Sequence, residues 1–580
     1  MFKLLVIMAP ALAICASFDP IIVSSKKDIR QSLITSNVEI ISEQKIENNI
    51  SSEVVDLLRP ISGMNISQTG GPGSPVSIFI RGAESRHTVV LIDGVRANDP
   101  SDIGASFNMS ALSSLDIEKI EIIKGPQSLL YGSDAVGGVI NIITKKAEAG
   151  GEASLGLGVQ KELSNSLTTY GKNNVFYLNT FYNESEVISA LKSDKEKDKS
   201  ENKGATLNYA HVFGNLEGEW QVKYLDSFVE FDNAFGDSTI PHSESLTQIY
   251  SQKLQLNDLK LNTSHLKSDR FSRFSATTAI TYSGSRTTNE MTYNLSSKNS
   301  KVLIGLSHEY FTYEQSGQDE FKANRYGAFI DNVTKLNSYI VSGGARLTKH
   351  EDFNNFTSFN FGFGKNLPNR KQIKVNYATG FKSPTLYQLN TFEPGVFETF
   401  GNKKLNPEKS RSVEFTFLSL TPIGYQVSIF DTSIDDFITY NSGTSTFENA
   451  KGLRSYGIDM SLNQNIGKFI LSEGLLLNKA HDSSRKYALK RPEQKVNFNG
   501  LYKFNDNNTF NFNWYWVSSQ VDFGDVFIKA YDITNITFTH MVRSIRIKLG
   551  LRNLFNKQYE ESANYNTLGF NTYIKAEYRY

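Results

Sequence analysis

The sequence predicts an antiparallel β-barrel in a membrane, preceded by a smaller mixed domain. Three observations predict this fold. The chain of 580 residues is too long for one ordinary core, its only long apolar run lies at the start, and alternation of apolar and polar residues recurs from about residue 150 to the end. A mean hydropathy of −0.34 argues against a bundle of membrane helices, and a net charge of +1 gives no argument for nucleic acid.

The first segment, "MFKLLVIMAPALAICAS", has the features of a secretory signal peptide. A lysine precedes an apolar stretch of about a dozen residues, and small residues follow. The stretch is too short to cross a bilayer as a helix. We therefore expect a signal peptide over residues 1–17, with a lipid-modified Cys15 as the alternative. Because Cys15 is the only cysteine, the mature chain is expected to have neither disulfides nor a thiol nucleophile.

The next part of the chain predicts a compact domain of short elements. The segment "SSEVVDLLRPISGMNI" predicts a helix. Glycine-terminated segments of alternating or continuous apolar character predict short strands: "SIFIRG", "TVVLIDG", "IEKIEIIKG" and "GGVINIITKK". A phosphate-binding loop is excluded at "GPQSLLYGSD", because no Lys-Ser/Thr pair follows the glycine.

Strict alternation after this domain predicts membrane strands. It is clear in "IRIKLGLRNLF" and in the last nine residues, "TYIKAEYRY". No long amphipathic helix follows residue 150 to cover a large sheet, so lipid is expected to cover the apolar face. This pattern favours a membrane barrel over a soluble array of β-sandwiches.

Closure of the barrel explains why a strand runs to the last residue. A closed barrel has no free edge, so the last strand must pair with the first. At about 20 residues per strand with its connections, the remaining ~430 residues allow about 22 strands. A lumen of that width would leak unless it were filled, so the preceding domain is predicted to act as a plug.

Several segments resemble TonB-dependent outer-membrane receptors: "IFIRGAESRHTVVLIDGVRAND", "IEKIEIIKGPQSLLYGSDAVGGVINIITKK" and the terminal "LRNLFNKQYE" and "YRY". The resemblance implies a 22-stranded antiparallel transmembrane β-barrel with an N-terminal plug domain in the lumen. It implies a location in the bacterial cell outer membrane, in contact with lipid, and a partner in TonB of the inner-membrane energy-transducing complex. The expected divisions are a TonB box and linker (18–30), a plug (31–148) and a barrel (149–580).

A short segment after the signal peptide resembles the TonB box of this family. It comprises Asp19, Pro20, Ile21, Ile22, Val23, Ser24 and Ser25. An extended, β-branched segment near a flexible terminus can pair with the edge strand of a partner. A first strand of the plug is the alternative.

Three charged residues resemble a cluster that joins plug and barrel in the family. Arg81 lies in the "IRG" motif, Glu414 lies in "SVEFTF", and Lys124 stands where many members have arginine. Breaking a buried ion pair leaves an uncompensated charge, so such a cluster would act as a latch. Lysine keeps the charge but lacks the bidentate fork of arginine. The alternative is that Arg81 pairs within the plug.

Within the family, the chain most resembles the cobalamin (vitamin B12) receptors. The resemblance lies in "YATGFKSPTLYQL", "GNKKLNPEKS", "SIDDFITY" and "ENAKGLRSYGIDM". It implies active transport of cobalamin or a related corrinoid, with a ferric siderophore or haem as the alternative ligand. Residues 381–410 contain no histidine, although haem receptors typically carry an axial one there. A passive porin or an adhesin would need neither a TonB box nor a latch. No catalytic motif predicts an enzyme.

The resemblance also implies which residues meet the ligand. It places two plug loops, 69–75 and 96–108, at the outer apex. We expect contacts from these loops and, on the barrel, from the segment after residue 386: Gly70, Gly71, Asn98, Asp99, Asp102, Tyr387 and Phe392.

Calcium is the one ion that the resemblance suggests, and no cofactor is required. Cobalamin receptors order external loops with calcium, and hard cations need several converging carboxylates. The corresponding region offers Asp194, Asp198, Asp226, Asp232 and Asp237. Interleaved lysines leave a solvated charged loop as the alternative. The sequence also leaves open whether a surface lipoprotein acts as a partner.

Overall fold

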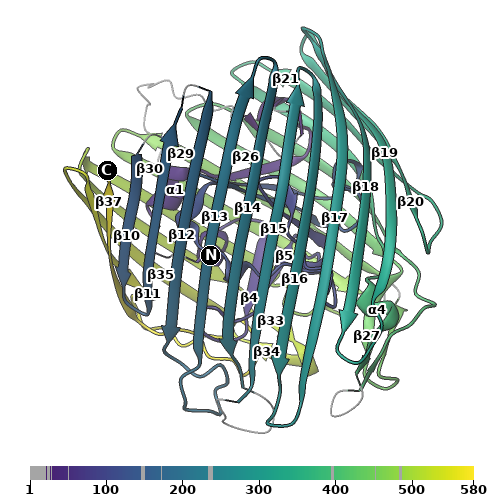
Figure 1. Cartoon of the computed structure of the whole chain (residues 1–580). Coiled ribbons are helices and arrows are strands. Elements are labelled where there is room, and N and C mark those ends of the chain that lie inside the picture. The colour runs from purple at the N-terminus through teal and green to yellow at the C-terminus, as the bar shows by residue number, and fades with distance from the viewer. Residues whose placement is uncertain are drawn as a thin grey trace.

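The protein is a β-barrel that surrounds an N-terminal domain (Figure 1). The computed structural model describes residues 21–580 except 23–25, 28, 50, 52, 146–149, 172, 233–239, 394–397, 451 and 483–485. The predicted signal peptide and the predicted boundary between plug and barrel therefore lie outside the described residues. Among the residues that are described, no helix is long and apolar enough to cross a membrane.

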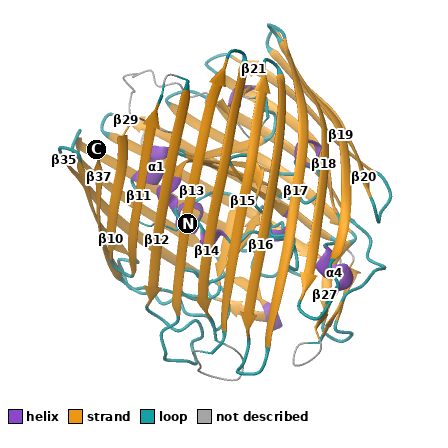
Figure 2. Cartoon of the chain, viewed as in Figure 1, coloured by secondary structure: helices purple, strands orange, loops and turns teal. Residues whose placement is uncertain are grey.

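Twenty-two of the described strands form one closed antiparallel barrel, as predicted. Figure 2 shows how strands dominate the molecule. In ring order they are β10 (Gly150–Leu157), β11 (Gln160–Tyr170), β12 (Asn174–Glu186), β13 (Lys199–Phe213), β14 (Leu216–Glu230), β15 (His242–Leu256), β16 (Leu259–Arg273), β17 (Ala279–Ser296), β18 (Ser300–Gln315), β19 (Phe321–Leu336), β20 (Tyr339–His350), β21 (Phe356–Leu367), β22 (Lys371–Lys382), β25 (Glu408–Ser419), β26 (Ile423–Asp435), β29 (Leu453–Ile466), β30 (Phe469–Asp482), β31 (Gln494–Asn505), β32 (Asn508–Val517), β35 (Tyr531–Val542), β36 (Ile545–Arg552) and β37 (Asn571–Arg579).

The last strand closes the ring, which confirms the explanation of the C-terminal pattern. β37 pairs with β36 on one side and with β10 on the other, from Glu152 opposite Arg579 to Leu157 opposite Ile574. Along β37, Ile574, Ala576 and Tyr578 are exposed on the outer face. Tyr573, Lys575 and Glu577 are buried on the lumenal face. Every strand edge in the ring is therefore paired, as hydrocarbon requires.

The two ends of the barrel differ in the length of their connections. One end carries short turns, such as those after β13, β15 and β19, and it also holds the start of β10 and the end of β37. The other end, at the bottom of Figure 1, carries longer loops with their own elements. These elements are α4 (Leu386–Asn390), β23 (Phe392–Glu393), β24 (Thr399–Phe400), β27 (Phe437–Asn441), β28 (Thr446–Ala450), β33 (Gln520–Asp522) and β34 (Val526–Ile528).

The plug is built on a five-stranded sheet in the order β3-β8-β9-β6-β7. Its strands are β3 (Asn37–Ile41), β6 (Thr88–Ile92), β7 (Val95–Arg96), β8 (Ile117–Lys124) and β9 (Gly138–Thr144), and β4 (Met64–Gln68) pairs separately with β5 (Val76–Ile80). Short helices flank the sheet: α1 (Glu43–Glu47), α2 (Val54–Leu58) and α3 (Ser128–Tyr131). The four predicted strands are confirmed. The helix predicted over residues 51–66 was too long. In the structure α2 ends at Leu58, and Met64 begins β4, which pairs with β5.

The apolar core of the plug continues into the barrel wall. It gathers buried residues of α2, β4, β8 and β9 around Leu58, Met64 and Ile120. Four inward-facing wall residues join the same cluster: Phe181, Leu225, Ile249 and Leu266. These wall residues belong to β12 and β14–β16. This sector of the lumen therefore holds the plug by non-directional apolar contact, beside a buried ion pair at 3.0 Å between Lys223 of β14 and Asp116 of the plug.

The N-terminal segment lies at the inner face of the barrel. β1 (Ile21–Ile22) pairs with β2 (Ile29–Arg30), while Asp19, Pro20, Val23, Ser24 and Ser25 of the predicted TonB box lie outside the described residues. Lys26 Nζ lies 2.7 Å from Glu290 Oε2 of β17, and Lys27 forms an ion pair with Asp331 of β19. The chain is thus attached to the barrel directly after the predicted box.

The charged lumenal face of β37 generates a test of barrel stability. Lys548 Nζ lies 2.8 Å and Lys575 Nζ 3.4 Å from Glu577 Oε1, and all three side chains are buried. We predict that Glu577→Gln lowers the free energy of unfolding by about 3–5 kcal/mol, because it leaves buried cations uncompensated. Urea unfolding in detergent, followed by tryptophan fluorescence, measures it. Glu320→Gln, whose partner Lys322 is exposed, is the control and should cost no more than about 1 kcal/mol. Equal losses in both variants would contradict the prediction.

Candidate functional site

Asp459 of β29 forms the centre of an ion cluster between plug and barrel. Arg81 donates from Nε and Nη2 to Asp459 Oδ2 at 3.1 and 3.0 Å, and its Nη2 lies 2.9 Å from Glu414 Oε1. The guanidinium also stacks over the ring of Phe430 at 4.6 Å. All of these partners belong to the barrel, so among the described residues the ion pairs of Arg81 reach the wall and not another part of the plug.

A sharp turn brings Arg81 to the wall. Its backbone adopts the left-handed conformation, with φ of 46°, and Gly82 follows with φ of 83°. A Cβ at Gly82 would lie 2.6 Å from Ser455 Oγ of β29, so only glycine permits this close approach. Left-handed backbone is costly for arginine and tends to persist where the surrounding contacts fix it.

Lys124, at the end of β8, completes the cluster. Its Nζ lies 2.9 Å from Asp459 Oδ2 and 2.9 Å from Glu39 Oε2, and it donates to the carbonyl of Ser62 at 2.6 Å. The structure thus brings together Arg81, Lys124 and Glu414, the three residues singled out in the sequence. Sequence reasoning missed Asp459, although its inward parity in "SYGIDM" was a signal.

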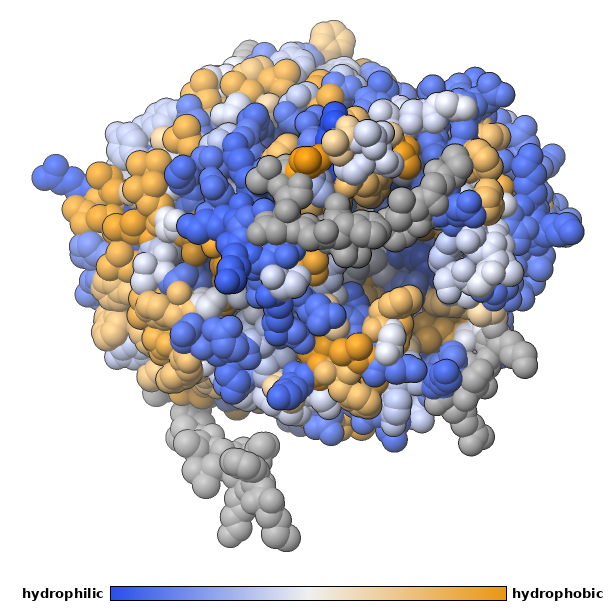
Figure 3. All heavy atoms as spheres, turned by 90° about the horizontal axis from the view of Figure 1, so that it is seen from below, coloured by the Kyte–Doolittle hydropathy of each residue, from blue (hydrophilic) through white to orange (hydrophobic). Residues whose placement is uncertain are grey.

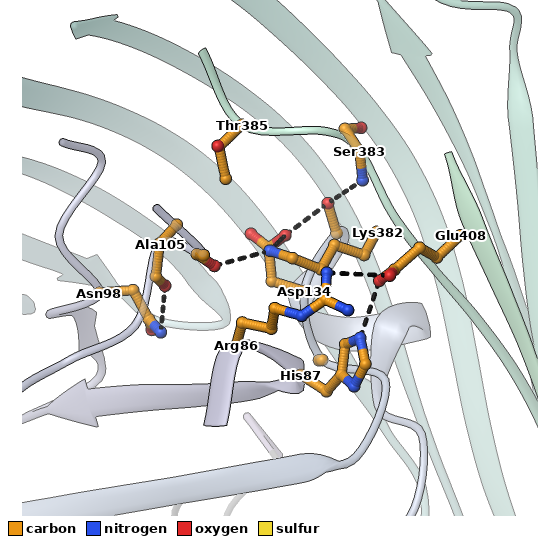
Figure 4. A network of polar contacts seen from close by, with 12 residues as sticks. Arg86, His87, Asn98, Ala105, Asp134, Lys382, Ser383, Thr385 and Glu408 are labelled. Carbon is orange, nitrogen blue, oxygen red and sulfur yellow. Dashed lines mark hydrogen bonds and ion pairs between the residues drawn. The ribbon is translucent and has the colours of Figure 1, made fainter. Parts of the chain in front are cut away.

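Glu408 of β25 anchors a second network nearer the long-loop end (Figure 4). Its two carboxylate oxygens lie 2.9 Å from Arg86 Nη1 and 2.7 Å from His87 Nε2 of the plug. His87 Nδ1 accepts from the backbone N–H of Glu84, so Nε2 carries the proton and donates to Glu408. Burial lowers the pKa of His87, so this histidine is neutral and structural at pH 7.

A buried lysine ties the outer plug loop to the barrel. Lys382 Nζ lies 3.0 Å from Asp134 Oδ1 and donates to the carbonyl of Gly104 at 3.0 Å (Figure 4). Thr385 Oγ1 donates to the carbonyl of Ile103 at 2.9 Å. The segment around residue 104 is therefore attached to the end of β22, where the loop containing α4 begins.

The predicted apical residues of this plug loop differ in accessibility. Asn98 is fully buried: it accepts from the N–H of Val90 and donates to the carbonyls of Thr88 and Ala105. It shapes the loop and does not face the opening. Asp99 and Asp102 are half-buried and accept hydrogen bonds within the loop from Ser101, Gly104 and Ser106.

The other predicted contacts also divide into buried and exposed residues. Gly70 and Gly71 pack against the loop after β12, since Cβ atoms there would lie about 3 Å from Ala190 and Ile188. Tyr387 is buried, and its hydroxyl donates to Glu393 Oε1 at 2.8 Å. Phe392 is 52% exposed. Of this group only Phe392 presents a large free surface.

Exposed aromatic residues gather in the long loops. Figure 3 views this end and shows apolar patches among hydrophilic side chains. Among the described residues, the exposed aromatics of these loops are Phe392, Tyr440, Tyr487, Phe523, Phe527, Phe555 and Phe570. Aromatic side chains beside polar loops suit a bulky ligand with both apolar and polar groups.

Three carboxylates converge in the loops after β12 and β14. One oxygen each of Glu196, Asp198 and Asp232 lies within 4.8 Å of the others. Two of the predicted calcium ligands, Asp198 and Asp232, are thus brought together, and Glu196 was missed. Asp194 lies close enough to influence Asp198. The prediction of Asp226 was wrong, because it lies on the outward parity of β14 opposite Lys203, and Asp237 lies outside the described residues.

Comparisons with known proteins match both parts of the chain. The family described as "TonB dependent receptor-like, beta-barrel" matches residues 152–554, and the "TonB-dependent Receptor Plug Domain" matches residues 30–139. The chain belongs to the TonB-dependent receptors. It is an outer-membrane protein of a family of transport receptors that work with TonB. Short periplasmic turns and long external loops are the rule in such barrels, which places the long-loop end outside the cell.

Individual relatives point to different ligands. The vitamin B12 transporter BtuB of Vibrio cholerae serotype O1 is 25% identical over 97% of this chain and 95% of its own length. Among solved structures, the siderophore receptor PirA of Acinetobacter baumannii has a TM-score of 0.80 at 17% identity, covering 94% of this chain and 98% of its own. The ferric enterobactin receptor of Pseudomonas aeruginosa has a TM-score of 0.78 at 16% identity, covering 94% and 99%. The structural similarities show the fold alone.

The cluster at Asp459 generates a test of coupling. We predict that Arg81→Ala and Asp459→Ala each lower stability by about 3–5 kcal/mol and raise leakage of hydrophilic solutes. The double variant should add little, because both changes remove the same contact. Urea unfolding and planar-bilayer conductance measure the two effects. The exposed outer pair Arg454 and Asp431 supplies matched control substitutions. Additive losses at Arg81 and Asp459 would argue against direct coupling.

Proposed function

We propose that the chain imports cobalamin or a related corrinoid across the outer membrane. The observation that carries the proposal is the end-to-end likeness to a vitamin B12 transporter, since 97% of this chain aligns with 95% of that relative. The solved siderophore receptors match as completely in space but at only 14–17% identity. Similarity of fold at that level does not separate one ligand from another.

The outer face is compatible with a bulky ligand of mixed polarity. A corrinoid carries amide groups around a large ring, so its site needs broad polar contact and apolar support. The exposed aromatics of the long loops offer the apolar part. Asp99 and Asp102 offer carboxylates at the plug apex, and Arg270 Nη1 lies 3.4 Å from Asp102 Oδ1. A ferric siderophore is the alternative ligand.

Ligand titration of the purified receptor tests the assignment. We predict sub-micromolar binding of cobalamin by calorimetry, with no chemical change in the ligand, and no comparable binding of ferric enterobactin or haemin. Phe392→Ala should weaken binding about tenfold, because an exposed aromatic contact is lost. Phe361→Ala, which removes an equally exposed ring from the outer barrel surface, is the control. Tight binding of a ferric chelate without cobalamin binding would move the assignment to siderophores.

We further propose that calcium orders the external loops through Glu196, Asp198 and Asp232. Asp232 Oδ2 accepts from Ser189 Oγ and from the N–H of Leu191, and its Oδ1 is buried and accepts no hydrogen bond among the described residues. Burial raises the pKa of Asp198 to about 6. The hydrogen bond that Asp198 accepts from the N–H of Ala190 opposes this rise in pKa, and the nearby charge of Asp232 adds to it. A bound cation would compensate this concentration of negative charge.

The raised pKa of Asp198 gives the calcium proposal a pH test. Below about pH 6 Asp198 takes up a proton, so calcium affinity should be present at pH 7 and fall several-fold by pH 5. Calorimetry with calcium and then with chelator measures the affinity. Asp198→Asn and Asp232→Asn should weaken binding at least tenfold, whereas Asp226→Asn should not. Unchanged affinity between pH 7 and pH 5 would refute the role of Asp198.

A further inference from the structure

A narrow cavity separates the plug from the barrel wall along strands β29–β35. It has a volume of about 160 Å³. At its outer end it is lined by Gly71 of the plug and by Thr567 and Leu568 of the loop between β36 and β37. At its inner end it is lined by Asn463 and Ile470, which lie close in sequence to the short periplasmic turn between β29 and β30. The cavity therefore extends from the external loops toward the periplasmic end of the barrel.

Uncharged amides cover the wall side of this cavity. Inward-facing asparagines of four strands line it: Asn463 of β29, Asn497 and Asn499 of β31, Asn511 and Asn513 of β32, and Asn535 of β35. On the plug side, Gln44, Asn48 and Asn49 add further amides. A side-chain amide both donates and accepts hydrogen bonds and carries no charge, so this surface suits neutral polar groups.

The charged residues of the lining lie elsewhere. Two ion pairs cross its outer part, Asp56 with Arg552 and Arg59 with Glu561. The other charged residues of the lining are Glu39, Lys45, Glu53 and Glu473. Glu39 pairs with Lys124 at 2.9 Å, and Glu473 has the outward parity of β30. Among the described residues of β29–β35, no inward-facing residue that lines the cavity is charged.

Some of the wall amides have hydrogen-bonding groups to spare. Asn513 is half-buried, and its side chain makes no hydrogen bond with a described residue. Asn499 donates to Asn511 Oδ1 at 3.2 Å, which leaves its own amide oxygen open. Asn511 in turn lies 3.5 Å from the carbonyl of Asn48 in the plug. The amides are thus in place to exchange hydrogen bonds with a solute.

This sector of the wall should separate from the plug at the lowest cost. In other sectors, separation breaks buried ion pairs or uncovers apolar surface. Here the surfaces already stand apart, and Lys495, which donates to the carbonyls of Ile61 and Met64, is the attachment beside the cavity. A second cavity, of about 630 Å³, lies against β13–β18, but its lining is rich in charged residues and includes none of the described external loops.

We propose that the amide-lined wall of β29–β35 is an inner binding surface along which the ligand leaves the external site. The inference rests on the proposed function, since a corrinoid carries amide groups that can exchange hydrogen bonds with successive wall amides. A neutral ligand needs no opposite charge in the wall. The helices α1 and α2 contribute to the plug side of the cavity, so their displacement uncovers this surface.

A matched pair of cysteine variants tests the route. The sequence contains only Cys15, in the predicted signal peptide, so a single new thiol reports its own position. Ser472→Cys lies in the amide-lined cavity and Ser264→Cys in the second cavity, and both serines are half-buried. Cells that express the receptor with TonB are given cobalamin with a maleimide on one amide. Mass spectrometry should find at least tenfold more adduct in Ser472→Cys, and only in energised cells.

A second pair of variants tests the wall amides without a reactive probe. Asn513→Leu should lower cobalamin uptake at least tenfold and leave binding at the cell surface unchanged. Asn262→Leu, which removes an inward-facing amide from the second cavity, is the control and should leave both unchanged. Adduct mainly in Ser264→Cys, uptake without adduct in Ser472→Cys, or full uptake by Asn513→Leu would each overturn the inference. Absence of cobalamin binding at the surface would instead overturn the proposed function, and the inference with it.

Discussion

One constraint governs the rest of the structure: backbone polar groups that lie in hydrocarbon must all be hydrogen-bonded within the protein. The chain meets it by closing 22 strands into a ring, in which β37 pairs with β10. A ring of this size encloses a lumen that wall side chains alone do not fill. The plug fills that space, and its contacts with the wall determine both the seal and the resistance to movement.

These contacts differ from one sector of the wall to another. Along β12 and β14–β16, apolar side chains such as Phe181 and Leu225 merge with the core of the plug, and a single buried lysine of this sector, Lys223, pairs with a plug carboxylate. Along β25–β29 the buried ionic contacts centre on Asp459 and Glu408, and Val136 of the plug adds an apolar contact with the wall. Apolar contact is non-directional, whereas a buried ion pair loses most of its energy once its geometry is broken. Displacement of the plug toward the periplasm must therefore break a few discrete ionic contacts first.

The sequence indicated part of the site and left its geometry open. Arg81 and Glu414 were found through family motifs, because motifs preserve residue types at fixed places along the chain. Asp459 was missed, since alternation shows only that a residue faces the lumen and not which plug residue lies opposite. Likewise, Asp198 and Asp232 converge with Glu196, but Asp226 has the outward parity of its strand. Asp198 and Asp232 are 34 residues apart in sequence and lie on different loops, so their proximity depends on how the barrel closes.

The sequence by itself determined the barrel, the plug and the closing strand. Alternation with a period of two fixes which face of each strand meets lipid, and a terminal strand of this kind has stability only in a closed ring. Only the tertiary structure decided which charges meet. It placed Arg96 of the plug among arginines of β17, β19 and β20, which lie far from it in sequence. Such contacts depend on the register of the ring and the depth of the plug, and neither is encoded in any local pattern.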